Sequence, residues 1–596
     1  MIRTPLRPLA RILPAREAGE NPDAIERENI RARHEDMRDH ARQRAEGRLL
    51  VLGLFFFCAF GVVGLRMGAL ATSEPVEPRT AAQGAAISAS RADIVDRNGH
   101  LLATNFETHA LYAQPPHMVD PVASAKGLAA VFPDLKEADL IQQFTGKRKF
   151  LWIKKKISPE QMQLVHEIGD PGLMFGPRDM RLYPNGALAA HVLGGASFGK
   201  EGVSAAEVIG VAGVEKQFDD YLRDPANGQK PLELSLDLTV QAASERVLYG
   251  GMKIMNAKGA TSVLMDVHTG EVISVVSLPN FDPNNRPRPA TKGDQSDSPL
   301  FNRSVQGVYE LGSTFKIFAA AQAVELGLVS PSTIIDTSGP MRVGGFPIGE
   351  FRNKNYGKLS VSDIIVKSSN RGTGRMALQI GVKRQQDFLK SLGFFEATPF
   401  EIFEARTGKP LLPKRWTDLS AVTISYGHGL STSPMHLAAG YAAIANGGFK
   451  VDPTILKKSG PQTKERVMST GAANAARDML RAVVTSGTAS MGEVPGYAVG
   501  GKTGTADKPK PRGGYYEDKV IATFATLFPA HDPKYVLVVT LDEPVETSGD
   551  KPRRTAGWTA VPVAAEMIGR IAPLLGLRPT VEPGRLADIT LTSSND

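Results

Sequence analysis

Hydrophobic residues are spread unevenly along this chain of 596 residues. The run LLVLGLFFFCAFGVVGL, residues 49–65, is apolar throughout and stands between Arg48 and Arg66. Its length is at the short end of what spans a bilayer, and weakly polar neighbours through Leu70 extend it. The pattern predicts a membrane helix over residues 49–70.

A cleaved signal peptide is the alternative, because residues 69–71, Ala-Leu-Ala, have the small-x-small form of a cleavage site. The charged leader, residues 1–48, and the long apolar core favour an uncleaved anchor. Several arginines precede the run, whereas only Arg66 and Arg79 follow within a similar distance. This asymmetry predicts a cytoplasmic N-terminus, with everything after Leu70 outside the cytoplasm.

The segments on either side of the predicted anchor differ in their residue patterns. The Arg-rich leader begins an exposed helix at Asn21-Pro22, which we expect to run to about Arg44. Residues 72–84 are polar and contain proline, which is typical of a linker. Next, ISASRADIVDRNGHLLATN predicts a strand, a hairpin turn at Asn98-Gly99 and a return strand.

The segment GKRKFLWIKKKISP, residues 146–159, interleaves basic residues with apolar and aromatic ones. Such a mixture can bind nucleic acid, but outside the cytoplasm we expect no nucleic-acid partner. The segment therefore predicts a strand with solvated lysines, and a docking surface for a protein partner is the alternative.

A second pattern begins near Pro231, where LELSLDLTVQAASERVL predicts a strand followed by an amphipathic helix. Strand patterns recur in ATSVLMDVHTGEVISVVSL and, much later, in VIATFATLF and YVLVVTLDEP. Helical stretches lie between them, and a last helix is expected over about Ala560–Ile571. Early strands, a helical middle and late strands predict an α/β domain with a sheet assembled from both ends.

Composition adds little to this picture. Hydrophobic content of 42% and charged content of 22% are typical of a globular protein. The net charge of +8 is a modest excess for the size. Cys58 is the one cysteine, so an intrachain disulfide and a cysteine metal site are both excluded. We predict no cofactor and no metal.

Candidate chemistry starts in YELGSTFKIFAAAQAVELG, residues 309–327. Ser313 opens an apolar helix there, and Lys316 lies one turn later on the same face. A lysine in the first turn opposes the helix dipole and loses hydration when buried, and both effects favour its neutral form. A neutral Lys316 is able to take the proton of Ser313 and make it a nucleophile.

Ser-x-x-Lys alone is weak evidence, because it recurs at Ser197 and Ser548, where no apolar helix follows. Two further motifs strengthen it. KSSN supplies Ser368 and Asn370 in a predicted loop between helices, and GGKTGTA lies on a predicted strand. The latter motif supplies Lys502, Thr503, Gly504 and Thr505.

The ordered set Ser-x-x-Lys, Ser-x-Asn, Lys-Thr-Gly resembles the active site of a penicillin-binding protein. RADIVDRNG, RLYPNGALAAHVLG and GVAGVEKQFDDYL resemble the non-catalytic pedestal of class B members, and SYGHGLSTSPMHLAAGYAAIANGG resembles their transpeptidase domain. The resemblance covers about residues 85–570. Leu311, Ala92 and His428 depart from the residues common at these positions and do not touch the catalytic set.

The resemblance implies a transpeptidase domain of the penicillin-binding and serine β-lactamase type, an α/β (α+β) fold with a central antiparallel sheet flanked by helices. An elongated α+β pedestal and one transmembrane helix would precede it. The predicted division is a cytoplasmic tail (1–48), the anchor (49–70), the pedestal (71–225), the transpeptidase domain (226–578) and a disordered tail (579–596).

The implied activity is that of a serine-type peptidoglycan D,D-transpeptidase, also a β-lactam target. Ser313 would form an acyl-enzyme with stem peptides ending in D-Ala-D-Ala, aided by Lys316, Ser368, Asn370 and Lys502. The resemblance further implies that Thr503, Gly504 and Thr505 bind substrate, with the amides of Ser313 and Thr505 as the oxyanion hole.

The leader and the SYGHGLSTSP segment resemble the septal, cell-division type, whose partners are a membrane glycosyltransferase of the shape, elongation, division and sporulation family and other division proteins. We expect a single-pass protein of the bacterial inner membrane with a periplasmic catalytic domain. An elongation-specific transpeptidase is the alternative, and a β-lactam sensor is less favoured. A β-lactamase is disfavoured because no Glu-x-x-Leu-Asn segment is found.

Overall fold

The computed structural model describes residues 9–72, 91–201, 206–227, 230–462, 465–510 and 513–580. They fall into two units, Met1–Ala85 and Ala86–Asp596, and each is described by itself. The linker expected over residues 72–84 lies outside the described residues from residue 73 onward, as does the predicted C-terminal tail from residue 581.

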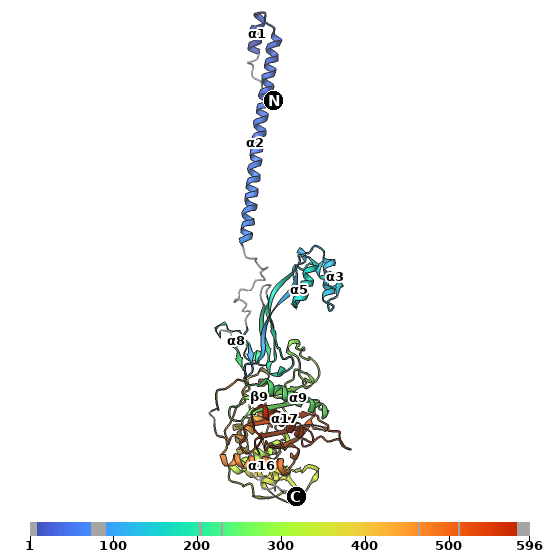
Figure 1. The fold of residues 1–596 in the computed structure, drawn as a ribbon, viewed down its shortest axis with the longest axis vertical. Coiled ribbons are helices and arrows are strands. Elements are labelled where there is room, and N and C mark those ends of the chain that lie inside the picture. Colours follow the sequence, from blue (N-terminus) through green and yellow to red (C-terminus); the bar gives the residue numbers. More distant parts are fainter. Residues whose placement is uncertain are drawn as a thin grey trace, which may run out of the picture. The chain divides into compact units, whose positions relative to one another are not determined.

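The first unit consists of helices α1 (Leu9–Glu17) and α2 (Pro22–Thr72) (Figure 1). Proline takes the first position of α2 as predicted, and the Asn21 side chain accepts the Asp23 amide at 3.0 Å. The helix does not end near Arg44 but continues through the apolar run. Among the described residues, one helical stretch, Glu46–Met67, is long and apolar enough to cross a membrane.

The second unit begins with a pedestal of strands and short helices (Figure 1). Its strands are β1 (Ile94–Val95), β2 (Leu101–Ala113), β3 (Leu151–Ile157), β4 (Leu173–Leu182), β5 (Gly195–Glu201), β6 (Ala206–Ala212) and β7 (Leu232–Glu233). Its helices are α3 (Pro121–Val131), α4 (Glu137–Phe144), α5 (Pro159–Ile168), α6 (Ala190–Leu193), α7 (Gly213–Gln217) and α8 (Asp219–Arg223).

Strand β2 organises the pedestal. It forms the predicted hairpin with β1, and along its length it pairs antiparallel with β3 and with β4. Helices α3, α4 and α5 enclose a small separate core with these strands. The basic segment at residues 146–159 supplies β3, as predicted, and Lys155 and Lys156 on it are exposed.

A buried ionic cluster links three segments of the pedestal that are far apart in the sequence. Arg91 donates to Glu215 and to Asp219, each at 2.7 Å, and Arg181 donates to Glu215 at 2.7 Å. Arg91, Arg181 and Glu215 are almost wholly buried, so each charge depends on the others for its stability. The three segments that resemble the class B pedestal therefore meet in this cluster.

The domain that follows the pedestal contains a five-stranded antiparallel sheet in the order β14-β15-β16-β8-β9. The strands are β8 (Gly259–Asp266), β9 (Val272–Leu278), β14 (Gly500–Pro509), β15 (Tyr515–Phe528) and β16 (Tyr535–Asp542). β8 pairs with β16 over Asp266↔Tyr535 to Gly259↔Asp542. The prediction of a sheet assembled from both ends of the domain is confirmed, and β14 lies at its edge.

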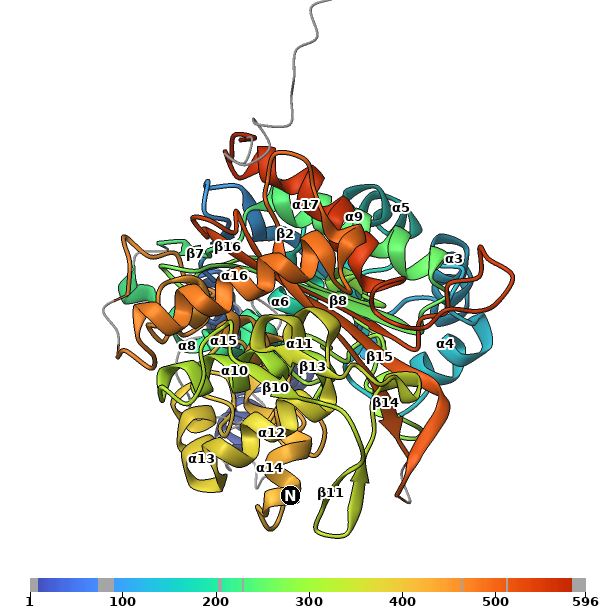
Figure 2. The same cartoon turned by 90° about the horizontal axis from the view of Figure 1, so that it is seen from below.

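Helices cover this sheet (Figure 2). α9 (Leu238–Ile254) and α17 (Ala560–Leu574) pack on each other and on the strands, as do α15 (Pro434–Ala445) and α16 (Thr470–Ser486). The remaining helices are α10 (Lys316–Glu325), α11 (Val361–Lys367), α12 (Asn370–Ile380), α13 (Val382–Ser391) and α14 (Asp418–Ser425). Short strands β10 (Ile334–Asp336), β11 (Met341–Val343), β12 (Phe346–Ile348) and β13 (Lys358–Ser360) precede α11.

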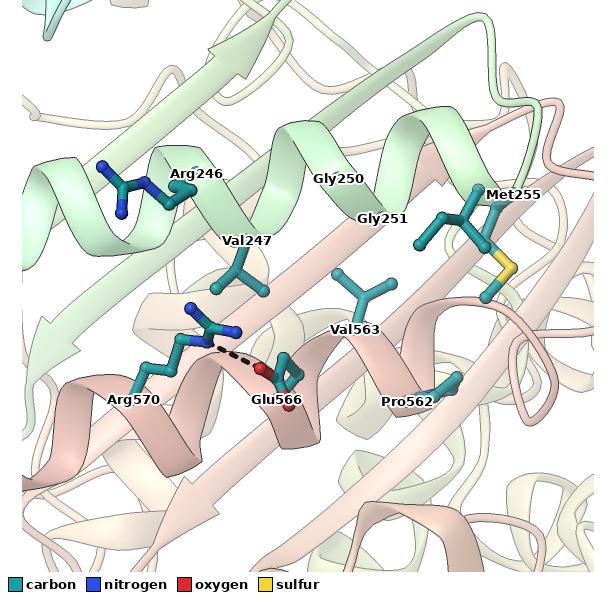
Figure 3. A pocket seen from close by; sticks show the side chains of 10 residues that line it. Arg246, Val247, Gly250, Gly251, Met255, Pro562, Val563, Glu566 and Arg570 are labelled. Carbon is teal, nitrogen blue, oxygen red and sulfur yellow. Dashed lines mark hydrogen bonds and ion pairs between the residues drawn. The ribbon is translucent and has the colours of Figure 1, made fainter.

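A shallow groove runs between α9 and α17 (Figure 3). Val247 and Val563 give it an apolar floor, and Gly251 allows the close approach of the two helices because a Cβ there would lie 2.6 Å from Val563. Glu566 and Arg570 pair at its rim. No member of the predicted catalytic set lines this groove, so the chemistry lies elsewhere.

Candidate active site

The turn that carries Ser313 is a short 3-10 helix, Gly312–Phe315, followed directly by α10. We expected Ser313 to open the α-helix itself; in the structure it lies in a tighter 3-10 turn, and the α-helix begins at Lys316. Gly312 adopts a left-handed backbone conformation with φ of 57°, which favours glycine, and its amide donates to Gly427. Most of α10 is buried, as its apolar sequence predicts.

Lys316 is completely buried. Its Nζ donates to the Ser368 carbonyl oxygen at 2.6 Å, to Ser368 Oγ at 3.0 Å and to Asn370 Oδ1 at 2.7 Å. Ser368 closes α11 and Asn370 opens α12, so the Ser-x-Asn motif occupies the predicted turn between two helices. The first two motifs therefore meet at one amine.

Lys502 brings in the third motif from edge strand β14. Its side chain is also completely buried, and its Nζ donates to Ser368 Oγ at 3.1 Å and to the Thr503 carbonyl at 3.1 Å. Ser368 Oγ thus lies between two lysine amines.

Burial shifts the protonation of both amines. Loss of hydration lowers the pKa of Lys502 to about 7. The pKa of Lys316 falls well below its usual value, first because of burial and second because of the charge of Lys502, while Glu350 partly opposes the shift. This downward direction of the Lys316 pKa is the one expected from its sequence context.

Strand β14 lies close against the Ser313 turn. A Cβ on Gly504 would lie 2.2 Å from the Leu311 carbonyl oxygen, so only glycine permits this approach. Thr503 exchanges a hydrogen bond of 2.7 Å with Thr488. Thr505 Oγ1 accepts the Ala556 amide at 3.0 Å and keeps its own hydrogen for another acceptor.

Several residues around this site are not marked by any motif in the sequence. The Glu310 carboxylate, three residues before Ser313, accepts the Gly429 amide at 2.8 Å and the Tyr515 hydroxyl at 3.1 Å, and lies 3.2 Å from His428 Nδ1. These contacts join the serine segment to the SYGHG segment and to the start of β15. No spacing in the sequence connects these positions.

The other two Ser-x-x-Lys pairs lie in different settings. Ser197 is on strand β5 of the pedestal, and Ser548 lies in the segment after β16. Neither is followed directly by a helix in the described residues: β6 comes after Ser197, and α17 begins only at Ala560.

This arrangement defines a class of site: a serine at a helix start, two buried lysines, and a glycine-thinned edge strand beside them. Such a combination is typical of enzymes that form a serine acyl intermediate without a histidine.

Comparisons with known proteins agree with this class. Residues 260–565 match the model of the penicillin-binding protein transpeptidase domain, and residues 86–235 match that of the penicillin-binding protein dimerisation domain. The chain is 32% identical to the probable peptidoglycan D,D-transpeptidase FtsI of Caulobacter vibrioides over 94% of this chain and 92% of that protein. It is 27% identical to the peptidoglycan D,D-transpeptidase FtsI of Escherichia coli K12, over 83% and 85% of the two chains.

Solved structures show the same fold. Penicillin-binding protein 3 of Mycobacterium tuberculosis, complexed with ampicillin, superimposes with a TM-score of 0.62 at 26% identity, covering 83% of this chain and 98% of that one. The chain belongs to the class B penicillin-binding proteins, a family of serine-type peptidoglycan D,D-transpeptidases.

Proposed function

We propose that this chain cross-links peptidoglycan stem peptides at the division septum through an acyl-enzyme on Ser313. The observation that carries the proposal is the meeting of Lys316 and Lys502 at Ser368 Oγ, beside the turn that holds Ser313. The septal role rests on the resemblance of the leader and of the SYGHGLSTSP segment to the cell-division type.

Lys316 is the base in this scheme. A neutral lysine has two hydrogens and one lone pair, so it cannot donate to all three of its partners at once. The Ser368 carbonyl and Asn370 Oδ1 accept only, whereas the Ser368 hydroxyl is also able to donate to the lone pair. When substrate enters, rotation of the Ser313 hydroxyl toward this lone pair allows Lys316 to take its proton.

Acylation then proceeds by addition and elimination. Ser313 Oγ attacks the carbonyl carbon of the penultimate D-alanine as its proton passes to Lys316. When the peptide bond breaks, the proton reaches the leaving nitrogen through the Ser368 hydroxyl, and D-alanine departs as a neutral amine. In the second half-reaction an amine of a neighbouring stem attacks the ester carbonyl and gives up one proton to Lys316. As the ester bond breaks, Lys316 passes this proton to Ser313 Oγ, which restores the free hydroxyl.

Edge strand β14 positions the donor peptide. An extended substrate is able to add as a further strand because, among the described residues, β14 has a neighbouring strand, β15, on one side only. Lys502, Thr503 and Thr505 bind the terminal carboxylate, and the free hydrogen of Thr505 suits this role. The amides of Ser313 and Thr505 stabilise the oxyanion, a contribution worth about a hundredfold to a thousandfold in rate per donor.

The apolar stretch Glu46–Met67 supports a single-pass location in the inner membrane. The arginines before it favour a cytoplasmic N-terminus and a periplasmic catalytic domain. A glycosyltransferase of the shape, elongation, division and sporulation family is the expected partner, because this chain would join peptides only where new glycan strands are made.

Covalent labelling by a fluorescent penicillin tests the acyl-enzyme. Ser313→Ala should lose the label, whereas Ser197→Ala and Ser548→Ala should keep it, and mass spectrometry of the labelled peptide should identify Ser313. Label retained by Ser313→Ala would refute the assignment of the nucleophile.

Depletion of the protein in cells tests the septal role. Filaments without septa are expected, and rounded cells would favour the elongation alternative.

A further inference from the structure

Glu350 is a buried carboxylate that the proposed catalytic set does not include, and it lies against the Ser-x-Asn turn. Only 5% of its surface is exposed. Three consecutive residues of the turn donate to it: Ser369 Oγ at 2.6 Å, the Asn370 amide at 2.8 Å and the Arg371 amide at 3.0 Å. A buried charge needs such donors, and the start of α12 supplies them.

The turn that Glu350 holds has a strained backbone. Ser368 is in the left-handed region with φ of 60°, which is unfavourable for a non-glycine residue and persists only where the surroundings enforce it. Ser369 caps α12 by accepting the Gly372 amide at 3.0 Å. Because the same Ser369 hydroxyl donates to Glu350, the carboxylate fixes the cap that ends the strained turn.

The position of this turn decides the surroundings of Lys316. All three acceptors around Lys316 Nζ belong to Ser368 or Asn370. The segment of Glu350 touches the turn a second time, because Asn370 Nδ2 donates to the carbonyl of Gly349 at 2.9 Å. A shift of this segment would therefore move every hydrogen-bond partner of the amine.

The charge of Glu350 also acts on Lys316. It favours the ammonium form and raises the pKa of Lys316, against the larger lowering by burial and by Lys502. Tyr356 and Tyr426 also face the carboxylate, but burial and then Glu350 raise the pKa of both, so they stay neutral. The Arg371 side chain is directed to the Ile348 carbonyl. Glu350 and Lys502 therefore act in opposite directions on the pKa of Lys316, which Glu350 raises and Lys502 lowers.

We propose that Glu350 is a positioning residue for acylation, which fixes the Ser368–Asn370 turn and balances the charge of Lys502 at Lys316. The inference rests on the proposed role of Lys316 as the base that activates Ser313. Glu350 touches neither substrate nor the reacting atoms, and it acts through the turn and through its field.

The test is the acylation rate of the full-length protein by a fluorescent penicillin, measured from about pH 5 to about pH 10. Glu350→Gln should lower the plateau rate at least about tenfold, because an amide cannot accept all three donors. Removal of the negative charge lowers the pKa of Lys316, so the midpoint of the acid limb should move down by about one pH unit. Glu350→Asp keeps the charge and should lower the plateau at an unchanged midpoint.

Glu401→Gln is the matched control. Glu401 also accepts one hydroxyl and one backbone amide, from Thr454 at 2.8 Å and Ile455 at 2.9 Å, but none of its bonds reaches the Ser-x-Asn turn. Its plateau and midpoint should match those of the wild type.

Each outcome decides the proposal. A Glu350→Gln plateau that falls at an unchanged midpoint, or no change at all, would overturn it. If Glu350→Gln does not fold, as judged by its melting temperature, then a wild-type plateau in Glu350→Asp would overturn it instead. If the acylation rate of the wild-type protein shows no acid limb, the role of Lys316 as the base is refuted, and this inference with it. If the wild-type protein shows an acid limb and Glu350→Gln leaves its midpoint unchanged, only the inference about Glu350 is refuted.

Discussion

Replacing Lys502 by methionine should move the acid limb of acylation to higher pH. Lys502 Nζ and Lys316 Nζ donate to the same atom, Ser368 Oγ, at 3.1 and 3.0 Å, so the two nitrogens are close neighbours. Without the charge of Lys502, the ammonium form of Lys316 is less disfavoured and its pKa rises. The fraction of neutral base at a given pH then falls.

The magnitude follows from this spacing. Bonds of 3.1 and 3.0 Å to one atom keep the two nitrogens within about 6 Å of each other. Unit charges at that distance repel by about 3 kcal/mol at an effective dielectric constant of about 20, which corresponds to about 2 pH units. Because the pKa of Lys502 is itself about 7, this lysine is only partly charged near neutrality. The expected upward shift of the midpoint is therefore smaller, about one pH unit.

The assay is the same rate of penicillin labelling as a function of pH. The plateau should also fall, because Lys502 is proposed to bind the substrate carboxylate, and the midpoint separates the two effects. Lys519→Met is the control, since Lys519 is a half-exposed lysine on β15 that pairs with Glu543. A midpoint in Lys502→Met that stays in place or moves down would refute the electrostatic argument.

Two further predictions concern backbone packing and pH. Gly504→Ala should reduce the acylation rate at least about tenfold, because its Cβ would lie 2.2 Å from the Leu311 carbonyl oxygen. The control is Gly250→Ala, whose Cβ would meet nothing within 4 Å and which should keep the wild-type rate. A normal acylation rate in Gly504→Ala would contradict the close approach of β14 to the Ser313 turn. Burial lowers the pKa of His436 from 6.5 to about 4. The unfolded state therefore binds the proton first, and the free energy of unfolding should fall by about 3 kcal/mol as pH drops from 6.5 to 4. The free energy of unfolding in urea, measured across this pH range, should depend less steeply on pH in His436→Gln than in the wild type. An equal pH dependence would show that His436 is not the group responsible.

Much of the fold could be predicted from the sequence because its apolar runs are distinct. The strands within residues 259–278 and 520–542 are rich in apolar residues, which is typical of strands buried on both faces. The long separation of the two groups along the chain predicted one sheet built from two ends. The strand order was not predictable, because an apolar run does not specify its neighbours. The edge position of β14 therefore comes from the structure alone.

The candidate site divides in the same way. Ser313, Lys316, Ser368, Asn370 and Lys502 were found because their chemistry imposes short, fixed spacings. Glu350 carries no such spacing, since β13 and α11 separate it from the turn that it holds, and only tertiary packing brings them together. The 3-10 turn at Ser313 was missed because hydrogen bonding across Gly312 to Gly427 is not a local property of the sequence.

The pairing of β8 with β16 has a consequence for biogenesis. In the part of the chain that the structure describes, β15 and β16 separate β14 from β8 and β9 in the sheet, and they are made after all the other strands. A ribosome that has finished the Ser313 helix still has to make residues 500–542 before Lys502 has a scaffold to lie on. A chain interrupted anywhere before that point would lack the contact of Lys502 with Ser368, so the candidate site is assembled only after β16 has been made.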